Sequence, residues 1–271
     1  MKDIIDNRAR IGTTTKLRLL QRSFKENGFV WTFLMGCYYL ASAVADKSFA
    51  LADARRRARN LPGMNSANMN KLIWNEWDWS AKGEEWTPSP AWKQSVIDTL
   101  LVPNIPRGGN VVEIGPGGGR WTEALQTRAG TLTGIDISEA CVEECRKRFA
   151  HCGNVEFRVG SGTDLAGVEN NSVDAIWSFD VFVHINKPQF EAYAHEFARV
   201  LKPGGAGAVQ HGSVGGGLGG WRSDVTTDDV IGFLRSSGLV VAEQVSVWND
   251  RGREYKAGLY DDVVTIFRKP Q

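Results

Sequence analysis

Three glycines at alternate positions, Gly115, Gly117 and Gly119, lie in the part of the chain best suited to bind a nucleotide-type cofactor. They follow the apolar run 111–114 and come directly before a segment that can start a helix. Glycines let the backbone turn sharply and approach a ligand closely, and the start of a helix offers free amide donors. We therefore predict a buried strand, a glycine turn and a helix, with a cofactor bound at the turn.

The residues around these glycines indicate which cofactor is held. A dinucleotide-binding GxGxxG loop that begins at Gly115 needs a small residue at position 120, but the chain has Arg120 there. Asp136 closes a second apolar segment, 21 residues after Gly115. An acid about 20 residues beyond the first glycine is well placed to accept hydrogen bonds from ribose hydroxyls. The pattern therefore disfavours a nicotinamide dinucleotide and favours another ligand that contains ribose.

Further strands and helices are predicted in alternating order. Residues 155–159 and 172–179 have the character of a third and a fourth strand, and each is followed by a carboxylate, Asp164 or Asp180. Residues 199–205 look like a turn from a helix into a fifth strand, because glycines end helices and proline prevents their continuation.

The run from Glu113 to Gly119, ExGxGxG, resembles motif I of the class I S-adenosylmethionine-dependent methyltransferases. The later segments resemble further motifs of that family in the same order, over residues 92–268. The resemblance implies S-adenosylmethionine as the cofactor, with Glu113 supporting the glycine loop near the cofactor's amino group. Phe179 either forms a wall for the adenine or only packs in the core. The cofactor-binding residues expected on this basis are Glu113, Gly115, Gly117, Gly119, Asp136, Ile137, Gly162, Thr163, Asp164 and Phe179.

Two histidines fall where a proton acceptor would be needed. The sulfonium of the cofactor is an activated methyl donor, so the enzyme mainly aligns the reactants, but a hydroxyl acceptor must also lose a proton. His184 follows the fourth strand and His211 ends the fifth. We expect both to be catalytic residues that border the methyl-transfer pocket, with Asp180 orienting one of them. The alternative for each is a structural hydrogen bond near the cofactor.

Five tryptophans lie within nineteen residues ahead of the glycine loop: Trp74, Trp77, Trp79, Trp86 and Trp92. Indole faces stack on sugar rings or on a cationic sulfonium, and the alternative is a packed lid beside the sheet. Residues 74–90, together with 220–224, are similar to methyltransferases of bacterial polysaccharide and glycan modification. This similarity assigns Trp86, Trp221 and Arg222 to the acceptor site. Arg120 is either a surface residue at the helix start or a contact for an anionic acceptor.

The expected fold class is α/β, with a Rossmann-like, doubly wound sheet of seven mostly parallel strands. The resemblance implies that the closing strand, 262–268, runs antiparallel between strands five and six. The other predicted elements of the second half are a helix over 139–149, a helix over 187–201, strand five at 206–211, a helix over 228–236 capped by Thr227, and strand six at 239–247. The glycine-rich residues 212–220 should form a loop at the ligand-binding edge.

Three regions follow from these patterns. Residues 1–63 are expected to be a helical N-terminal extension, residues 64–91 a tryptophan-rich linker or lid, with 65–70 as its polar linker, and residues 92–271 the cofactor-binding domain.

The first 60 residues are both basic and apolar. They contain twelve Lys or Arg and five Asp or Glu, whereas the remaining 211 residues contain twenty and twenty-six. The apolar run 29–45 is shorter than the roughly 20 residues that span a bilayer, so a transmembrane helix is not expected. One hypothesis is peripheral contact of residues 1–60 with anionic lipid through an interfacial helix. The alternative, which we favour at this stage, is a helix packed on the catalytic domain or in a dimer contact.

The cysteines show no paired framework, and no secretory cleavage site follows the start of the chain. We expect the cysteines to be reduced thiols. The protein is expected in the cytoplasm, either in solution or bound peripherally to the inner face of the cell membrane. Cys141, Cys145, His151 and Cys152 lack CxxC or HExxH spacing, so no metal site is expected. The catalytic part is acidic overall, which argues against nucleic acid as a partner. The oligomeric state stays open.

The pattern as a whole predicts an S-adenosylmethionine-dependent methyltransferase that acts on a hydroxyl of a sugar, a glycan or a related small molecule. The alternatives are N- or O-methylation of another small metabolite and a non-catalytic, methyltransferase-like scaffold protein. A nicotinamide-dependent oxidoreductase is disfavoured by Arg120.

Overall fold

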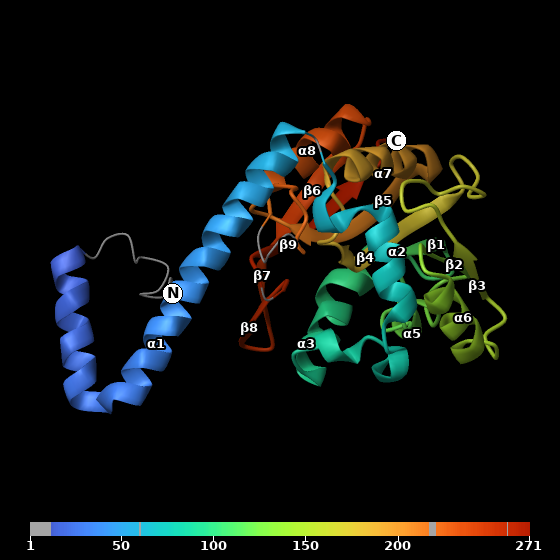
Figure 1. Ribbon diagram of the computed structural model, residues 1–271. Helices are drawn as coiled ribbons and strands as arrows, with labels where there is room; N and C mark the ends of the chain where they lie inside the picture. Colours follow the sequence, from blue (N-terminus) through green and yellow to red (C-terminus); the bar gives the residue numbers. More distant parts are fainter. Residues whose placement is uncertain (1–11, 60, 217–220, 259) are drawn as a thin grey trace. The chain divides into compact units, whose positions relative to one another are not determined.

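The computed structural model describes residues 12–59, 61–216, 221–258 and 260–271, in two compact units, 1–61 and 62–271. The described part of the first unit is mainly helix α1 (Thr13–Ala58), which Figure 1 shows as two helical segments joined at a bend. The bend is at Gly28, with φ 79° and ψ 175°. This combination is open essentially to glycine alone. The hydroxyls of Ser23 and Thr32 hydrogen-bond across the bend at 2.9 Å.

The second unit is built on a seven-stranded sheet in the order β3-β2-β1-β4-β5-β9-β6. Its strands are β1 (Asn110–Ile114), β2 (Thr131–Asp136), β3 (Val155–Val159), β4 (Val173–Phe182), β5 (Leu201–Gly212), β6 (Val240–Val245) and β9 (Asp262–Arg268). β9 runs antiparallel to both β5 and β6, while β3, β2, β1, β4 and β5 pair in parallel. The expected doubly wound sheet, with its antiparallel strand between strands five and six, is confirmed.

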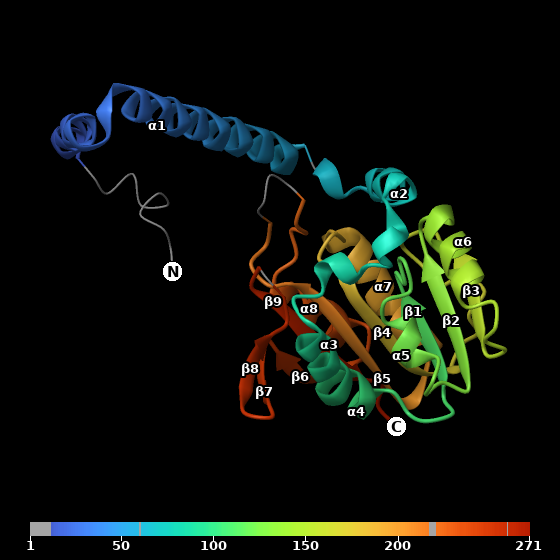
Figure 2. The ribbon, with the colours of Figure 1, turned by 90° about the horizontal axis from the view of Figure 1, so that it is seen from below.

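Helices cover both faces of this sheet (Figure 2). The α-helices of the second unit are α2 (Ala67–Glu76), α3 (Pro90–Val96), α4 (Val102–Asn104), α5 (Thr122–Leu125), α6 (Glu139–Arg148), α7 (Lys187–Val200) and α8 (Thr227–Ser236). Shorter helical turns are η2 (Gly63–Asn65), η3 (Trp79–Ala81), η4 (Glu84–Trp86) and the π-helical η5 (Ile97–Leu101). One core contains α3 and α5 side chains, and the other contains α7 and α8 side chains.

The central strands are buried on both sides, as expected for parallel strands between two helical layers. In β5, Ala208 belongs to the core of α3 and α5, whereas its neighbour Val209 belongs to the core of α7 and α8. The same alternation separates Trp177 from Ile176 in β4. Successive side chains of these strands therefore point to opposite layers, and this decides below which of them reach the site.

Two local predictions needed correction. Strand six ends at Val245 and is followed by a hairpin of β7 (Val247–Asp250) and β8 (Arg253–Lys256). Helix α8 is capped by Thr226 instead of Thr227, because the Thr226 hydroxyl accepts the amide of Asp229 while the Asp229 carboxylate accepts the amide of Thr226. This reciprocal capping box satisfies two amides at once. Of the predicted loop 212–220, residues 217–220 lie outside the described residues.

Candidate functional site

The glycine loop leaves β1 at the carboxyl edge of the sheet. Gly115 and Gly117 have φ of 68° and 54°, in the left-handed region that glycine adopts without strain. A Cβ atom on Gly117 would lie 2.9 Å from the Trp79 ring, and one on Gly115 would overlap Val181. The loop is therefore packed so closely that side chains are excluded from it.

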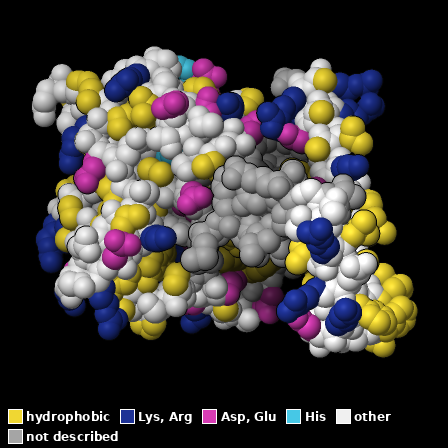
Figure 3. All heavy atoms as spheres, turned by 90° about the vertical axis from the view of Figure 1, so that its left-hand side faces the viewer, with side chains coloured by type: hydrophobic (Ala, Val, Ile, Leu, Met, Phe, Trp, Pro, Cys, Tyr) yellow, Lys and Arg dark blue, Asp and Glu magenta, His cyan; other side chains and the backbone are white. Residues whose placement is uncertain are grey.

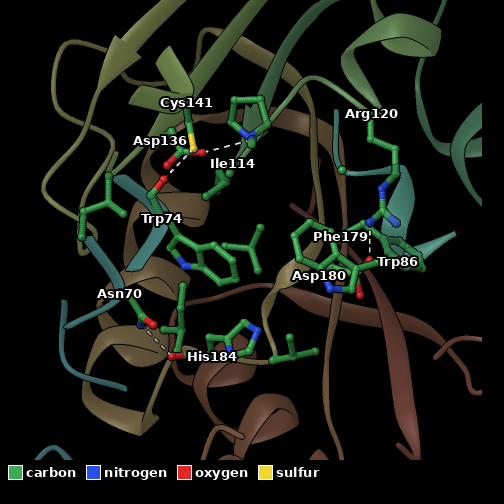
Figure 4. A pocket seen from close by; sticks show the side chains of 18 of the residues that line it. Asn70, Trp74, Trp86, Ile114, Arg120, Asp136, Cys141, Phe179, Asp180 and His184 are labelled. Carbon is green, nitrogen blue, oxygen red and sulfur yellow. Dashed lines mark hydrogen bonds and ion pairs between the residues drawn. The ribbon is translucent and has the colours of Figure 1, made fainter. Parts of the chain in front are cut away.

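A cavity of about 340 Å³ opens beside this loop (Figure 4), a volume suited to a small-molecule ligand. Its floor comes from the ends of three parallel strands, with Ile114 from β1, Asp136 from β2 and Phe179 from β4. Its cover comes from the tryptophan-rich segment before the domain core, including Trp74 and Trp86. The cavity thus lies at the edge of the sheet where doubly wound folds bind their ligands.

Asp136 lies in this cavity and supports the loop. One carboxylate oxygen accepts the amide of Gly117 at 3.1 Å, and the other accepts the amide of Ser138 at 2.9 Å. Burial raises the pKa of Asp136 to about 6, so the carboxylate is charged at neutral pH. Each oxygen has a second lone pair, which leaves capacity for two hydroxyl donors. The side chain, the glycine loop and the cavity volume therefore fit a ribose-containing cofactor.

Glu113 lies under the loop and does not line the cavity. It is fully buried, and its carboxylate accepts the Thr122 hydroxyl at 2.5 Å, which ties the end of β1 to the start of α5. Burial, with a smaller contribution from the charge of Asp136, raises the pKa of Glu113 to about 7. Glu113 therefore supports the glycine loop from below, and its place near the cofactor's amino group stays a prediction.

We expect Glu113→Gln to raise the melting temperature at pH 8 but not at pH 4.5. The folded-state pKa of about 7 lies above the ordinary 4.5, so the folded protein binds the extra proton and loses stability as pH rises between these values. A neutral amide removes this loss while still accepting the Thr122 hydroxyl. Thermal unfolding of the wild-type protein and of Glu113→Gln from pH 4.5 to 8 measures the difference in melting temperature at each pH. An increase in melting temperature of equal size at every pH would contradict a raised pKa of Glu113.

The remaining cofactor candidates divide into two groups. Ile137 and Gly162 line the cavity together with Asp136, and the φ of 84° at Gly162 requires a glycine. Gly119, Thr163 and Asp164 are not among the lining residues. Asp164 instead accepts the amide of Ala166, which closes its own turn.

Phe179 and Asp180 line the cavity from the last part of β4, where its pairing with β5 is irregular, and Asp180 forms an ion pair with Arg120. The Arg120 side chain is only 5% exposed and its guanidinium lies 4.8 Å from the centre of the Trp121 ring, so a surface role is excluded. Its Nη1 atom is buried and has no hydrogen-bond partner in the described part of the chain. An unpartnered buried donor costs about 1–3 kcal/mol, and a ligand oxygen would remove this cost.

A second ion pair lines the same cavity, between Arg222 and Asp262. Gln210 links the two pairs, because its side-chain oxygen accepts the amide of Asp180 at 2.7 Å and its nitrogen donates to Asp262 at 3.2 Å. Asp180 has a left-handed φ of 61°, unusual for a non-glycine residue and typical of functional sites. Neither Gln210 nor Asp262 was predicted as a site residue, since neither belongs to a local sequence motif.

His184 borders the cavity beneath Trp74 (Figure 4). Its Nδ1 lies 2.8 Å from the carbonyl oxygen of Trp221, and because a carbonyl only accepts, Nδ1 carries the hydrogen and Nε2 keeps a lone pair. Its own carbonyl accepts the side-chain amide of Asn70 at 3.2 Å. Burial lowers the pKa of His184, which keeps the ring neutral near pH 7. The structure thus presents a neutral, oriented imidazole at the cavity.

His211 is not brought to the cavity, and its expected position must be corrected. The side chain is fully buried on the layer of α7, where its ring meets Phe190 at 5.9 Å and its Nε2 lies 2.7 Å from the Thr265 hydroxyl. Burial lowers the pKa of His211 to about 4. Side chains of a strand alternate in direction, so Gln210 points toward the cavity side and His211 points away from it.

The tryptophan-rich segment forms a cover over the glycine loop. The rings of Trp74, Trp77, Trp79 and Trp86 contact one another with centroids 5.4–6.0 Å apart. Trp92 is separate, because it belongs to the core and packs on Phe179.

The expected polar linker at 65–70 already contains the start of α2, whose Asn70 and Trp74 line the cavity. Asn75 joins this cover to α6 by accepting the Ser138 hydroxyl at 2.7 Å. The signal that could have revealed α2 is its N-cap, where the Ser66 hydroxyl accepts the amide of Met69.

Among the described residues, no group of three or more His, Cys, Asp or Glu side chains is arranged to hold a metal ion. Cys141 and Cys145 are buried thiols, and burial raises the pKa of both. Cys145 lies 3.2 Å from the Gly117 carbonyl oxygen and packs beneath the loop.

Part of the chain is similar in sequence to known methyltransferases. Residues 111–205 match the sequence family described as "Methyltransferase domain". The chain is 30% identical over 132 residues to proteins named "Ubiquinone biosynthesis O-methyltransferase" from Xanthomonas axonopodis pv. citri and from Xanthomonas oryzae pv. oryzae. The match covers 48% of this chain and 54% of each relative, so the chain spans about half the length of these relatives.

Solved structures share the fold. A chain from the complex between the Haloferax volcanii Trm112 methyltransferase activator and a methyltransferase superposes with a TM-score of 0.54 and 21% identity, over 71% of this chain and 96% of that one. An S-adenosylmethionine-dependent methyltransferase from Aquifex aeolicus gives a TM-score of 0.52 and 18% identity, over 71% and 98%. At these identities the likeness concerns the fold alone.

Proposed function

We propose that this chain, which carries a class I S-adenosylmethionine-dependent methyltransferase domain, transfers the methyl group of that cofactor to a hydroxyl group. The observation that carries the proposal is the oriented, neutral His184 in the same cavity as Asp136 and the glycine loop. The domain boundaries proposed with it are an N-terminal extension over residues 1–63, a cover over 64–91 and the cofactor-binding domain over 92–271.

Each lining residue has a distinct task in this proposal. The bound cofactor supplies a methyl group on a positively charged sulfur, which needs no further activation. Gly115 and Gly117 allow close approach of the backbone, and Asp136 accepts the ribose hydroxyls. Ile137 and Gly162 border the adenine, and Phe179 closes the cavity from the core side. The tryptophan cover excludes water from the reacting groups.

His184 acts as the general base. Its Nδ1 hydrogen is held by the Trp221 carbonyl, so Nε2 is the atom that takes the hydroxyl proton. Asp180 and Arg222 contribute opposing electrostatic effects on the ring, and burial outweighs both. His184 therefore starts the reaction neutral, which is the state required of a base.

The proposal predicts a one-sided pH dependence. Below its lowered pKa, which lies under the ordinary 6.5, His184 gains a proton and can no longer accept one. We expect kcat at saturating cofactor to be constant near pH 7–8 and to fall about tenfold per unit of pH below that pKa. S-adenosylhomocysteine affinity, measured at each pH, separates this effect from titration of Asp136. A kcat that rises toward acid pH would contradict a histidine base.

We propose a sugar or glycan hydroxyl as the acceptor. Sugars need flat faces for stacking and paired donors and acceptors for their hydroxyls. The cavity offers Trp86 and Trp221 together with the Arg120–Asp180 and Arg222–Asp262 pairs. The unpartnered Nη1 of Arg120 is a donor available to an acceptor oxygen. A phenolic or other small-metabolite acceptor is the second candidate, favoured by the ubiquinone-biosynthesis relatives.

Thermal unfolding and methyl transfer test the function. S-adenosylmethionine and S-adenosylhomocysteine should raise the melting temperature, whereas NAD should not. Transfer of labelled methyl to nucleotide sugars, lipid-linked glycans and phenols then identifies the acceptor class. Cofactor binding without transfer to any of them would favour the scaffold alternative, and stabilisation by NAD alone would refute the methyltransferase.

We also propose that the catalytic unit is cytoplasmic and that residues 1–60, the N-terminal extension, contact the inner face of the cell membrane. The balance of +7 in this segment supports attraction to anionic headgroups. Such contact would suit an acceptor carried on lipid.

A further inference from the structure

Helix α1 presents apolar side chains to solvent along the run 29–45. Six large apolar side chains of this run are each at least 41% exposed: Val30, Trp31, Phe33, Leu34, Tyr39 and Leu40. Full burial of one such side chain stabilises by about 1.5–3 kcal/mol. Figure 3 shows yellow apolar side chains exposed together with dark blue Lys and Arg side chains on the face that it views. An exposed apolar surface of this kind is stable only when lipid or another protein surface buries it.

The distribution of these side chains around the helix indicates the kind of cover. Tyr39 follows Val30 by about two and a half turns, so the two lie on opposite sides of the helix. Trp31 lies about 100° from Val30 around the helix axis, and Phe33 and Leu40, which are seven residues apart, share the flank opposite Trp31. A second helix, or a membrane surface, would cover one stripe and leave the others in water. A helix that is apolar all round is instead typical of a membrane span or a protein core.

The charge of the flanking residues and the length of the run 29–45 agree with a membrane-spanning helix. Residues 13–28 contain four Lys or Arg and one Glu, and residues 46–59 contain five and two Asp, so each flank has a balance of +3. Residues 29–45 rise about 26 Å as a helix, close to the hydrocarbon thickness of about 30 Å. The helix continues without interruption to Ala58, so Lys47 can extend its charged end toward headgroups. An 18-residue stretch of α1 has the length and composition to cross a membrane, and 6% of it is buried.

The bend at Gly28 separates this stretch from the residues before it. Residues 13–27 combine Leu20 and Phe24 with Arg18 and Arg22, the mixture found in helices that lie at a membrane surface. The left-handed Gly28 and the Ser23–Thr32 hydrogen bond stabilise a change of direction between the two segments.

We infer that residues 29–45 of α1 insert across a lipid bilayer, with residues 13–27 as an interfacial helix at one side of it. The inference deepens the membrane contact proposed above and changes its kind, from attraction at the surface to burial in hydrocarbon. It revises the expectation that no segment spans a membrane, which rested on the count of seventeen apolar residues. It does not depend on the acceptor or on methyl transfer.

Extraction from vesicles tests the inference. The full chain is reconstituted with vesicles of phosphatidylglycerol and phosphatidylethanolamine, which are then washed with 1 M salt or with alkaline carbonate. We expect the wild-type protein to stay with the vesicles in both washes. Leu34→Arg, at the centre of the apolar run, should reduce the carbonate-resistant fraction roughly a hundredfold. The matched control Leu51→Arg, which adds the same charge at an exposed position beyond the run, should keep it.

Three outcomes would overturn the span. Release of the wild-type protein by salt would show surface contact only. A wild-type protein that stays in solution as a dimer, and becomes a monomer on Leu34→Arg, would show that a second copy covers the helix. Equal carbonate resistance of all three proteins would show that the run does not carry the attachment. Binding of S-adenosylhomocysteine to each variant shows that the catalytic unit is folded, so failure of the span is distinguishable from failure of the proposed activity.

Discussion

Replacing Asp136 with alanine is expected to lower the affinity for S-adenosylhomocysteine by more than a hundredfold. Two ribose hydroxyls donating to one carboxylate contribute about 1.5–3 kcal/mol each, and a total near 3 kcal/mol corresponds to a factor above 100. The variant also frees the Gly117 amide, which now donates to Asp136 at 3.1 Å, so the glycine loop loses one of its restraints. Titration calorimetry with S-adenosylhomocysteine measures the loss directly.

Asp164→Ala is the matched control for this experiment. Asp164 was also predicted from the sequence to bind the cofactor, but its side chain closes a turn outside the cavity lining. We expect its removal to change the affinity by less than about threefold, in keeping with a carboxylate that makes no ligand contact. Equal losses in the two variants would mean that neither acts through the ribose, and an unchanged Asp136→Ala would remove the ribose assignment.

The part of the cavity beside the glycine loop could be predicted because its signals are local. Glu113, the three glycines and Asp136 all sit where a strand gives way to a turn, and the chemistry of that turn depends on residues only a few positions apart. The strand order could also be predicted, because the family that the glycine motif resembles implies a seven-stranded sheet with its antiparallel strand between strands five and six. The structure confirms this sheet around the glycine loop.

The acceptor half could not be predicted in the same way, because its contacts join distant segments. Gln210 reaches Asp262 across 52 residues, and Asn70 reaches His184 across 114. The direction of each β5 side chain was also open, since a shift of one residue reverses the face of every side chain in a strand. His211 was therefore expected at the cavity. In the structure it is Gln210, one residue earlier, that links Asp180 to Asp262 at the cavity.

His184 and His211 offer a matched pair, because the same exchange to asparagine should affect different quantities. His184→Asn removes the proton acceptor at the cavity, and loss of a general base lowers kcat by about 10²–10⁴-fold. The binding of S-adenosylhomocysteine should stay within about threefold of wild type, since the ring contacts Trp74 and the Trp221 carbonyl and not the glycine loop. Turnover at saturating cofactor, with the acceptor identified by labelled methyl transfer, measures the first effect.

His211→Asn should act on stability instead. The exchange leaves the buried Thr265 hydroxyl without its 2.7 Å partner and opens space beside Phe190, which together cost about 1–3 kcal/mol of unfolding free energy. Chemical denaturation measures this cost, and kcat of the folded fraction should remain near that of wild type. If His211→Asn lowered kcat as strongly as His184→Asn while leaving stability unchanged, the base would lie on β5. The sequence-based placement would then be right, because only a side chain turned toward the cavity could produce that result.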